Sequence, residues 1–465
     1  MRIRLTWIAA LLALMTIGMV LACSTKYSSS NNGLVVVPSQ GGEVIDGQGG
    51  PVMETFSLTL ANGHMSQINN VNGPPTPGLP TSVVLDPAGA FAYVIVYQNP
   101  IVSGGGVTGV ASFQIASDGK LGPGTTQGLN PSTMATAFCV FTQNGKTVTQ
   151  DIPVTVNAPV TPTSMVIDSA GQLLFVTDVA TSAQATYTCN GSSVTAEVPV
   201  PGAVSVFAVS DGTLSEVAGS PFPLPLPSGG QNPSASALAV TPTIYPTLYA
   251  PCSGFAVPTT ENLYVTDVVN YLVLNYSVSS SGSLELTEPS PGVSGVPTGT
   301  APDGVTVDPC NRFVYVANGG PSNNGNTVSA YTICSTLSQP NCQAPDFSLL
   351  PAKGSPFTIS PGDGPGPLAV DAYGGFLYVV DTASNVVSGF RISPSTGSLT
   401  PLTPPAVAAG LGANSIAIRS DDSWMFVANL TAGTLSQYAI TPGTGALTPQ
   451  QPISTFNYPS GVAVK

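Results

Sequence analysis

The chain has 465 residues, of which 42% are hydrophobic and only 7% are charged, and it contains 50 glycines and 45 prolines. This length allows a large core, and the glycine and proline content predicts many turns and short strands rather than helices. The net charge of −13 at pH 7 disfavours nucleic acid and phosphate-rich ligands, because few cations are available to pair with them. An all-β protein with no nucleic-acid partner is therefore expected.

Residues 1–22 have the pattern of a targeting segment. Arg2 and Arg4 precede an apolar run over residues 5–20, and Cys23 follows a small residue. The pattern resembles the signal of a bacterial lipoprotein, which implies cleavage before Cys23 and lipidation of that cysteine. An ordinary cleaved signal and a membrane-anchor helix are the alternatives, but the apolar run is short for a membrane span.

Residues 23–32 follow as a lipid-bearing cysteine and a flexible tether rich in serine and asparagine. Ser24 directly after the lipid site resembles lipoproteins that are sent to the outer membrane. The mature chain would carry eight basic and 23 acidic residues, a net charge of −15. We expect an outer-membrane lipoprotein in the cell envelope that faces the periplasm or the cell surface and contacts the membrane through its lipid.

A repeat organises the rest of the chain, and its clearest copy is PDGVTVDPCNRFVYVAN at residues 302–318. Residues 304–307 predict a first strand, the turn at Asp308 follows, and residues 313–316 predict a second strand of aromatic and β-branched residues. Outer hairpins follow the second strands in the other copies. The seven copies of the first strand with its final turn residue are residues 82–86, 164–168, 237–241, 304–308, 367–371, 415–419 and 461–465.

The seventh copy contains only a first strand, because the chain ends at Lys465. Its missing strands are found at the other end of the chain, in residues 33–37 and 55–65. A blade shared between the termini closes the ring and leaves no open sheet edge. The sequence thus predicts a seven-bladed β-propeller of four-stranded antiparallel blades over residues 33–465.

Three second-strand segments read YVTD at residues 264–267, YVAN at 315–318 and FVAN at 426–429. They resemble the YVTN-type repeat of the seven-bladed, lactonase-like (6-phosphogluconolactonase-like) propeller family. The resemblance implies the propeller fold and makes a lactonase activity an expectation. A 6-phosphogluconate-type substrate is disfavoured, because its phosphate requires cationic partners that this chain lacks.

Six cysteines besides Cys23 predict disulfides in an exported chain. Their places in the repeat predict three pairs: Cys139 with Cys189, Cys252 with Cys310, and Cys334 with Cys342. Zinc is the alternative, but the spacing contains no CxxC pair and the chain has one histidine.

Polar residues recur at the ends of the second strands, where loops of a propeller meet its central funnel. The candidate ligand-binding residues are Asp178, Asp267, Asn318, Asp381 and Asn429 at these strand ends, together with Asp303 at the entrance to the fourth blade. Such a ring can hold a divalent cation or a polyol, although no cofactor or metal is specifically predicted. In the alternative interpretation each side chain caps its own loop by bonding nearby backbone amides.

No complete catalytic set is visible in the sequence. His64 is the only histidine, and the repeat places it in an outer hairpin away from the funnel. The repeat likewise places Arg312, Arg391 and Arg419 on framework strands or turns. The catalytic residues of a hydrolase therefore stay unknown from the sequence alone.

Two insertions interrupt the repeat at about residues 127–160 and 181–202. Each reads as an extra hairpin, with Asn144-Gly145 and Asn190-Gly191 as the turns. Both are expected on the funnel side, as a partly closed lid, a partner epitope or structural decoration.

Two functions follow as hypotheses. The first is a lipid-anchored, monomeric envelope protein that acts as a binding or scaffold module for an unknown protein or carbohydrate. The alternative is a lactonase-like hydrolase that opens a sugar lactone in the central funnel.

Overall fold

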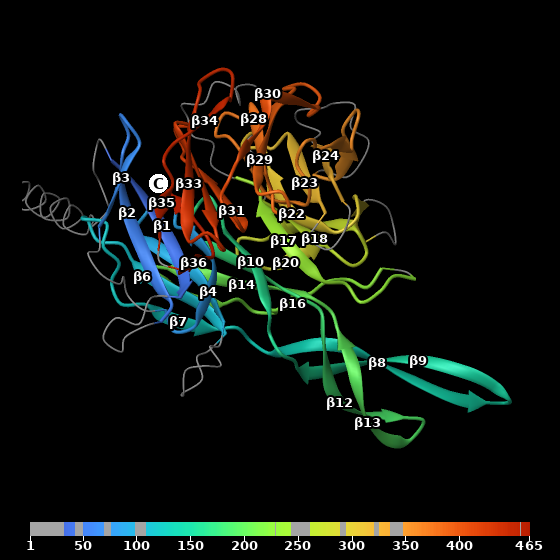
Figure 1. Ribbon diagram of the computed structural model, residues 1–465. Helices are drawn as coiled ribbons and strands as arrows, with labels where there is room; N and C mark the ends of the chain where they lie inside the picture. The colour runs from blue at the N-terminus through green and yellow to red at the C-terminus, as the bar shows by residue number, and fades with distance from the viewer. Residues whose placement is uncertain are drawn as a thin grey trace, which may run out of the picture.

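Sheets of antiparallel strands surround one axis in the computed structural model of the protein (Figure 1). The structure describes residues 32–41, 50–68, 76–97, 108–227, 229–242, 261–288, 294–319, 325–334, 347–455 and 457–465. Every helix or strand assigned within these ranges is a strand. In the same ranges, no helix is long and apolar enough to cross a membrane.

Seven sheets form the blades, and their first strands contact one another around a closed ring. Blades one to three contain β4 (Leu79–Leu85), β5 (Phe91–Tyr97), β6 (Gly109–Gln114) and β7 (Thr125–Gly128); β10 (Pro162–Ile167), β11 (Leu173–Asp178), β14 (Ala203–Ser210), β15 (Thr213–Glu216) and β16 (Phe222–Pro223); and β17 (Ala235–Val240), β18 (Glu261–Asp267), β19 (Leu272–Val278), β20 (Leu284–Leu286) and β21 (Val296–Pro297). Blades four to six contain β22 (Pro302–Val307), β23 (Phe313–Asn318), β24 (Thr327–Ile333), β25 (Leu349–Pro351) and β26 (Phe357–Thr358); β27 (Pro365–Val370), β28 (Phe376–Asp381), β29 (Val386–Ile392) and β30 (Leu399–Ala408); and β31 (Ala413–Ile418), β32 (Trp424–Asn429), β33 (Thr434–Ile440), β34 (Leu447–Pro449) and β35 (Ile453–Ser454). The predicted all-β, seven-bladed propeller is confirmed.

The seventh blade joins the two ends of the described chain. It combines β36 (Asn457–Pro459) and β37 (Ala463–Val464) with β1 (Asn32–Gly41), β2 (Val52–Thr59) and β3 (His64–Gln67). The Leu34 amide donates to the Lys465 carbonyl at 3.1 Å, and the Lys465 amide donates back to Leu34 at 2.9 Å. Ring closure therefore removes the sheet edge that an open array would expose.

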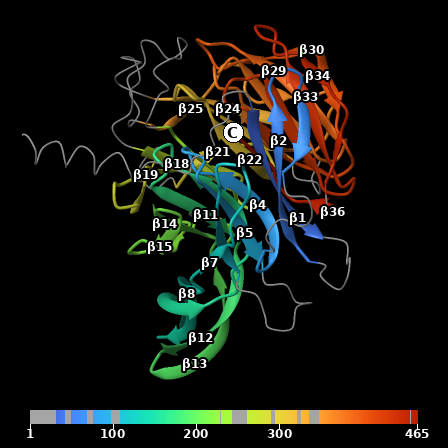
Figure 2. The ribbon, with the colours of Figure 1, turned by 90° about the vertical axis from the view of Figure 1, so that its left-hand side faces the viewer.

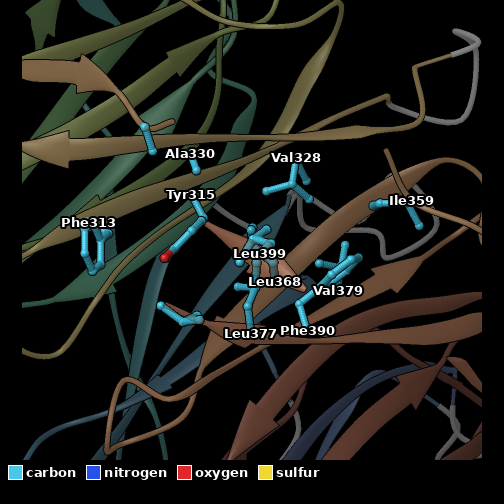
Figure 3. Packing of buried hydrophobic residues seen from close by; sticks show 13 residues of the cluster. Phe313, Tyr315, Val328, Ala330, Ile359, Leu368, Leu377, Val379, Phe390 and Leu399 are labelled. Carbon is cyan, nitrogen blue, oxygen red and sulfur yellow. The ribbon is translucent and has the colours of Figure 1, made fainter. Parts of the chain in front are cut away.

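Hydrophobic cores lie between neighbouring blades rather than within one sheet. Between blades four and five, Phe313 and Tyr315 of β23 face Leu377 and Val379 of β28 (Figure 3). The second strand is buried along its full length, which explains its aromatic and β-branched composition. Each such side chain contributes roughly 1.5–3 kcal/mol by leaving water.

One glycine shows how closely these blades approach. The Tyr315 hydroxyl donates to the carbonyl of Gly397 at 3.1 Å, in the outer hairpin of the next blade. Gly397 has φ +70°, and a Cβ atom there would lie 2.6 Å from the Phe313 ring. Both the backbone conformation and the contact therefore require glycine at this turn.

The first strands begin and the second strands end on the same face of the propeller, which we call the mouth face. The opposite face carries the turns between first and second strands and is called the turn face. Both chain ends of the seventh blade lie on the turn face, where the Lys465 ammonium donates to the Ala88 carbonyl. Strand β1 therefore begins on the turn face.

Two inserted hairpins, β8 (Ser132–Gln143) with β9 (Lys146–Asn157) and β12 (Thr181–Cys189) with β13 (Ser192–Val200), form an arm that leaves blade two on the mouth face. The arm projects away from the propeller in both views (Figures 1 and 2). Both Asn-Gly turns have positive φ at each residue, as type I′ hairpins require. Small side chains such as Ala137 and Ala185 pack between the hairpins.

The arm also contains the predicted bond between Cys139 and Cys189, with S–S 1.97 Å and Cα–Cα 5.4 Å. This pairing is confirmed. Cys310 and Cys334 are disulfide-bonded as well. Their predicted partners, Cys252 and Cys342, lie outside the described residues, as do Cys23 and the residues 1–22 that we predict to be a targeting segment.

Candidate functional site

A β-bulge lies near the start of the first strand in six blades, where the register against the second strand shifts. A bulge re-aims a side chain and often lies beside a functional site. In each of these blades, the residue that follows the last paired residue before the shift belongs to a set that we call the bulge ring. The seventh blade adds Ser460, which follows the paired Pro459. The members of the bulge ring are Thr81, Thr163, Ser236, Asp303, Gly366, Asn414 and Ser460.

All members of the bulge ring except Gly366 line a central cavity of about 1020 Å³. The cavity reaches the mouth face, because it is also lined by residues just after the second strands, such as Val268 and Leu430. Apolar side chains such as Met165 and Leu368 complete its wall. This volume is large enough for a sugar-sized ligand.

Several polar members of the ring bond to the next blade. The Thr163 hydroxyl donates to the Ala235 carbonyl at 3.4 Å, and the Ser236 hydroxyl donates to the Pro302 carbonyl at 2.6 Å. The Asn414 amide donates to the Ser460 carbonyl at 3.4 Å. These three side chains therefore link neighbouring blades beside the cavity, whereas the Thr81 hydroxyl and Asn414 Oδ1 are buried without a partner among the described residues.

Asp303 differs from the other members of the ring because it carries a carboxylate. It is the only carboxylate among the described residues that line the cavity, and none of those residues is Lys, Arg or His. The described residues offer its half-buried carboxylate no hydrogen-bond donor within reach, and burial raises the pKa of Asp303. Because a Cβ atom on Gly366 would lie 3.3 Å from Asp303 Oδ2, the glycine leaves room beside the acid. An unpartnered acid with a raised pKa is suited to accept a proton from a ligand.

The second-strand ends have a different environment from Asp303. Asn318 is fully buried: its Oδ1 accepts from the Thr298 hydroxyl at 2.8 Å and the Gly299 amide at 3.1 Å. Its Nδ2 donates to the hydroxyls of Thr327 at 3.0 Å and Ser329 at 2.9 Å. Asn318 is therefore saturated by its own blade.

Asn429 repeats this arrangement in blade six, with Gly410, Thr434 and Ser436 as partners. Asp267 is also fully buried and accepts from the backbone amides of Ser234 at 3.0 Å and Val269 at 3.1 Å. These two side chains thus cap loops, as the alternative interpretation of the sequence proposed.

Asp381 and Asp178 complete the set of second-strand ends. Burial raises the pKa of Asp381 to about 7, and its Oδ2 accepts from the Ser388 hydroxyl at 2.5 Å. Burial likewise raises the pKa of Asp178 to about 6, and this carboxylate accepts from the Thr161 amide. Of the six candidates taken from the sequence, the structure brings only Asp303 to the cavity wall.

The remaining ionisable candidates lie elsewhere. His64 begins β3, the exposed edge of blade seven, and Arg312 forms a buried ion pair with Asp308 at 2.6 Å on the turn face. Arg391 donates to the Gly443 carbonyl at 2.8 Å, and Arg419 pairs with Asp421. Within the described ranges no three His, Cys, Asp or Glu residues gather as a metal site.

The hydroxyl members of the bulge ring were missed by sequence reasoning. Their only sequence signal is a polar residue directly before the first residue of a first-strand copy, as in Thr163 and Ser236. Without a bulge, that position would alternate with its neighbours instead of facing the axis. The arm, by contrast, contributes no residue to the cavity wall in the part of the chain that the structure describes.

The fold and cavity define the chain as a seven-bladed β-propeller with a central site. The family model "Lactonase, 7-bladed beta-propeller" matches residues 348–464, so the family resemblance is confirmed over the end of the fourth blade, blades five and six, and the C-terminal strands β36 and β37 of blade seven. No curated protein sequence matches the chain significantly.

Solved structures extend the likeness in fold to nearly the whole chain. A candidate 6-phosphogluconolactonase from Bacteroides fragilis is 14% identical, with a TM-score of 0.58, and covers 94% of this chain and 99% of its own. A second one, from Bacteroides uniformis, is 15% identical, with a TM-score of 0.59, and covers 94% and 100%. The periplasmic gluconolactonase of Pseudomonas aeruginosa is 16% identical, with a TM-score of 0.58, and covers 93% and 99%.

Proposed function

We propose that the protein is a hydrolase of uncharged sugar lactones, with the substrate in the central cavity and Asp303 as the general base. The observation that carries this proposal is the single unpartnered carboxylate in a cavity ringed by hydroxyl and amide groups. The family match over residues 348–464 supports a lactone as substrate class.

The proposed reaction needs one acid that changes its protonation state. Asp303 takes a proton from water as the water oxygen bonds to the lactone carbonyl carbon. The ring C–O bond then breaks, and the same proton returns to the departing alkoxide, so the product is a hydroxy acid. A pKa raised by burial brings Asp303 closer to neutral pH, where general-base catalysis is most efficient.

The cavity wall selects against charged substrates. Its described residues include no cation that would pair with a phosphate, and Asp303 would repel one. Hydroxyl oxygens such as those of Ser236 and Ser415 offer acceptors to the hydroxyl groups of a neutral sugar. We therefore propose an unphosphorylated lactone, as the name of the Pseudomonas relative suggests, rather than the 6-phospho form.

An envelope location completes the proposal. The sequence pattern before Cys23 and the periplasmic relative both support export. Because β1 begins on the turn face, a lipid on Cys23 would hold that face towards the membrane. The cavity mouth and the arm would then point away from it.

The test uses the chain from Ser24 onward, which retains every described residue. Purified protein is incubated with a panel of five- and six-membered aldonolactones, and acid release is followed in a pH-stat with and without EDTA. We expect turnover that Asp303→Asn lowers at least 100-fold. Asp118→Asn is the matched control, because Asp118 is exposed in an outer hairpin and pairs with Lys120. Absence of turnover on every lactone, or full activity in Asp303→Asn, would overturn the proposal.

A second candidate function, a binding or scaffold module, is favoured by the arm. Met134, Phe138 and Val140 on one face of β8 are 47%, 46% and 60% exposed, which is unusual for large apolar side chains on one strand. Replacing residues 132–157 and 181–200 by short glycine-serine turns should leave lactone turnover intact. Loss of an envelope partner in co-purification on that deletion alone would support this function.

A further inference from the structure

Two tyrosines stand out on the mouth face by their exposure. Tyr271 lies between the second and third strands of blade three, and Tyr458 lies at the entrance to the first strand of blade seven. They are 41% and 54% exposed. Tyr271 lies in a turn and Tyr458 is the middle residue of β36. A large aromatic side chain left in water gains little from packing, so stability does not explain either residue.

Both tyrosines also have a backbone conformation that bulky residues rarely adopt. Tyr271 has φ +57° and Tyr458 has φ +63°. This left-handed region favours glycine and asparagine, because a side chain with a Cβ atom meets the following carbonyl. Strain of this kind, held by the surrounding structure, is characteristic of functional positions.

In other blades, the positions that correspond to the two tyrosines carry small residues or asparagine. Directly before the third strand, where blade three has Tyr271, blade five has Asn385 and blade six has Gly433, both with positive φ. In blade seven Tyr458 of β36 precedes Pro459. At the corresponding position, directly before the first strand, blades four, five and six have Ala301, Gly364 and Gly412, again with positive φ. Both tyrosines thus replace small residues or asparagine at positions that require the left-handed conformation.

Each tyrosine has an exposed leucine on the same side of the mouth. Leu226, 54% exposed, precedes the loop whose Gln231 bonds Asn270, the neighbour of Tyr271. Leu411 is 63% exposed, and its carbonyl accepts from the Ala432 amide. The next residue of that loop, Gly433, lies near Asn457, the neighbour of Tyr458. Blade three is three blades away from both blade six and blade seven, so the two apolar pairs lie on opposite sides of the cavity mouth.

We propose that Tyr271 and Tyr458 are stacking platforms for the rings of a linear neutral oligosaccharide that crosses the mouth of the cavity. The proposal deepens the proposed function and rests on it for the sugar chemistry of the central site. The flat face of a tyrosine suits the apolar face of a pyranose ring, and its hydroxyl bonds to water or to sugar hydroxyls. Two separated platforms on either side of a hydroxyl-lined cavity fit a chain of rings better than a protein, which would need one continuous apolar centre.

The test replaces each tyrosine by a residue that another blade carries at the corresponding position, in the variant Tyr271→Asn/Tyr458→Gly. Cellohexaose, maltohexaose and laminarihexaose are titrated into the chain from Ser24 onward by isothermal titration calorimetry. We expect at least one of them to bind the unmodified protein and to bind the variant at least tenfold more weakly. The melting temperature should stay the same or rise, since the variant relieves backbone strain. Equal affinity in both proteins, or no binding of any hexasaccharide, would overturn the proposal.

Two further measurements separate this proposal from the lactonase proposal. Turnover of a monosaccharide lactone should be unchanged in Tyr271→Asn/Tyr458→Gly, because the substrate fits inside the cavity. Asp303→Asn should keep its affinity for the hexasaccharide. Tyrosine-dependent binding without lactone turnover would support the stacking platforms and overturn the lactonase proposal. Capture of an envelope protein by the unmodified chain alone, with no hexasaccharide binding, would instead assign the platforms to a protein partner and overturn the saccharide proposal.

Discussion

Two sets of polar residues lie at the same end of the blades, but they differ in burial and in their hydrogen-bond partners. The second-strand ends, such as Asp267, Asn318 and Asn429, are fully buried and bond to loops of their own blade. All members of the bulge ring except Gly366 line the cavity, and one of them, Asp303, is the only carboxylate among the described residues of the cavity wall. Repetition of a polar residue around a propeller therefore marks a structural cap, and the blade that departs from its siblings marks the candidate site.

The largest effect that this comparison predicts is the loss of a cap. Asn318→Ala removes four hydrogen bonds and leaves the half-buried Gly299 amide without its acceptor. We expect the free energy of unfolding to fall by about 3 kcal/mol, as measured by urea denaturation. A change below about 0.5 kcal/mol would place Asn318 with solvated surface residues instead.

The second prediction concerns the pH dependence of stability. Burial raises the pKa of Asp381 to about 7, above its ordinary value of 3.8. The stability associated with the protonated carboxyl is complete below about pH 4 and is lost as the pH rises through 7, because the unfolded chain ionises first. Asp381→Asn should therefore stabilise the fold at pH 8 by on the order of 2 kcal/mol and change little at pH 4.

The control for that experiment is already present in the chain. Asp371, whose pKa burial also raises to about 7, stays in both proteins. The difference between the two curves of unfolding free energy against pH thus isolates Asp381. A difference that does not vary between pH 4 and 8 would contradict the raised pKa.

A smaller effect is expected in the bulge ring. Ser236→Ala removes the hydrogen bond to the Pro302 carbonyl of the next blade and should lower the free energy of unfolding by about 1 kcal/mol. Thermal denaturation at fixed pH measures it. A loss as large as that of Asn318→Ala would erase the distinction between the two sets.

The smallest global effect should come from the arm. Replacing Cys139 and Cys189 together by serine should raise hydrogen exchange in β8, β9, β12 and β13, while the main thermal transition of the propeller stays in place. Exchange confined to these hairpins would agree with an arm that folds as its own unit. Unfolding of blade two in the same experiment would show that the arm supports the propeller.

Local patterns explain how much of the structure the sequence predicts. The blades were predictable from the alternating pattern of the first strands, and the two inserted hairpins from the turns Asn144-Gly145 and Asn190-Gly191. The ring closure was predictable from the seventh first strand, which ends at Lys465. Each of these patterns depends only on residues that are neighbours in sequence. The pairing of Cys139 with Cys189 followed from their places in the repeat.

The site was predictable only in part, because the β-bulges determine which polar side chains face the cavity. A one-residue shift in register decides whether a polar residue faces the axis or a loop, and the sequence shows no register. Asp303 was therefore grouped with Asp267 and Asp381, although the structure separates them. The positive φ of Tyr271 and Tyr458 was also invisible, since tyrosine is not a residue that signals such turns.

The most direct test of the comparison is the variant Asp303→Ser, which gives blade four the residue that blade three carries at the same position of the bulge ring. Lactone turnover and the melting temperature are measured on the same preparation. We predict that turnover falls to the uncatalysed rate while the melting temperature is unchanged or higher, because a hydroxyl fits this position in the neighbouring blade. Turnover equal to that of the unmodified protein would contradict the assignment of Asp303 as the group that acts on the substrate.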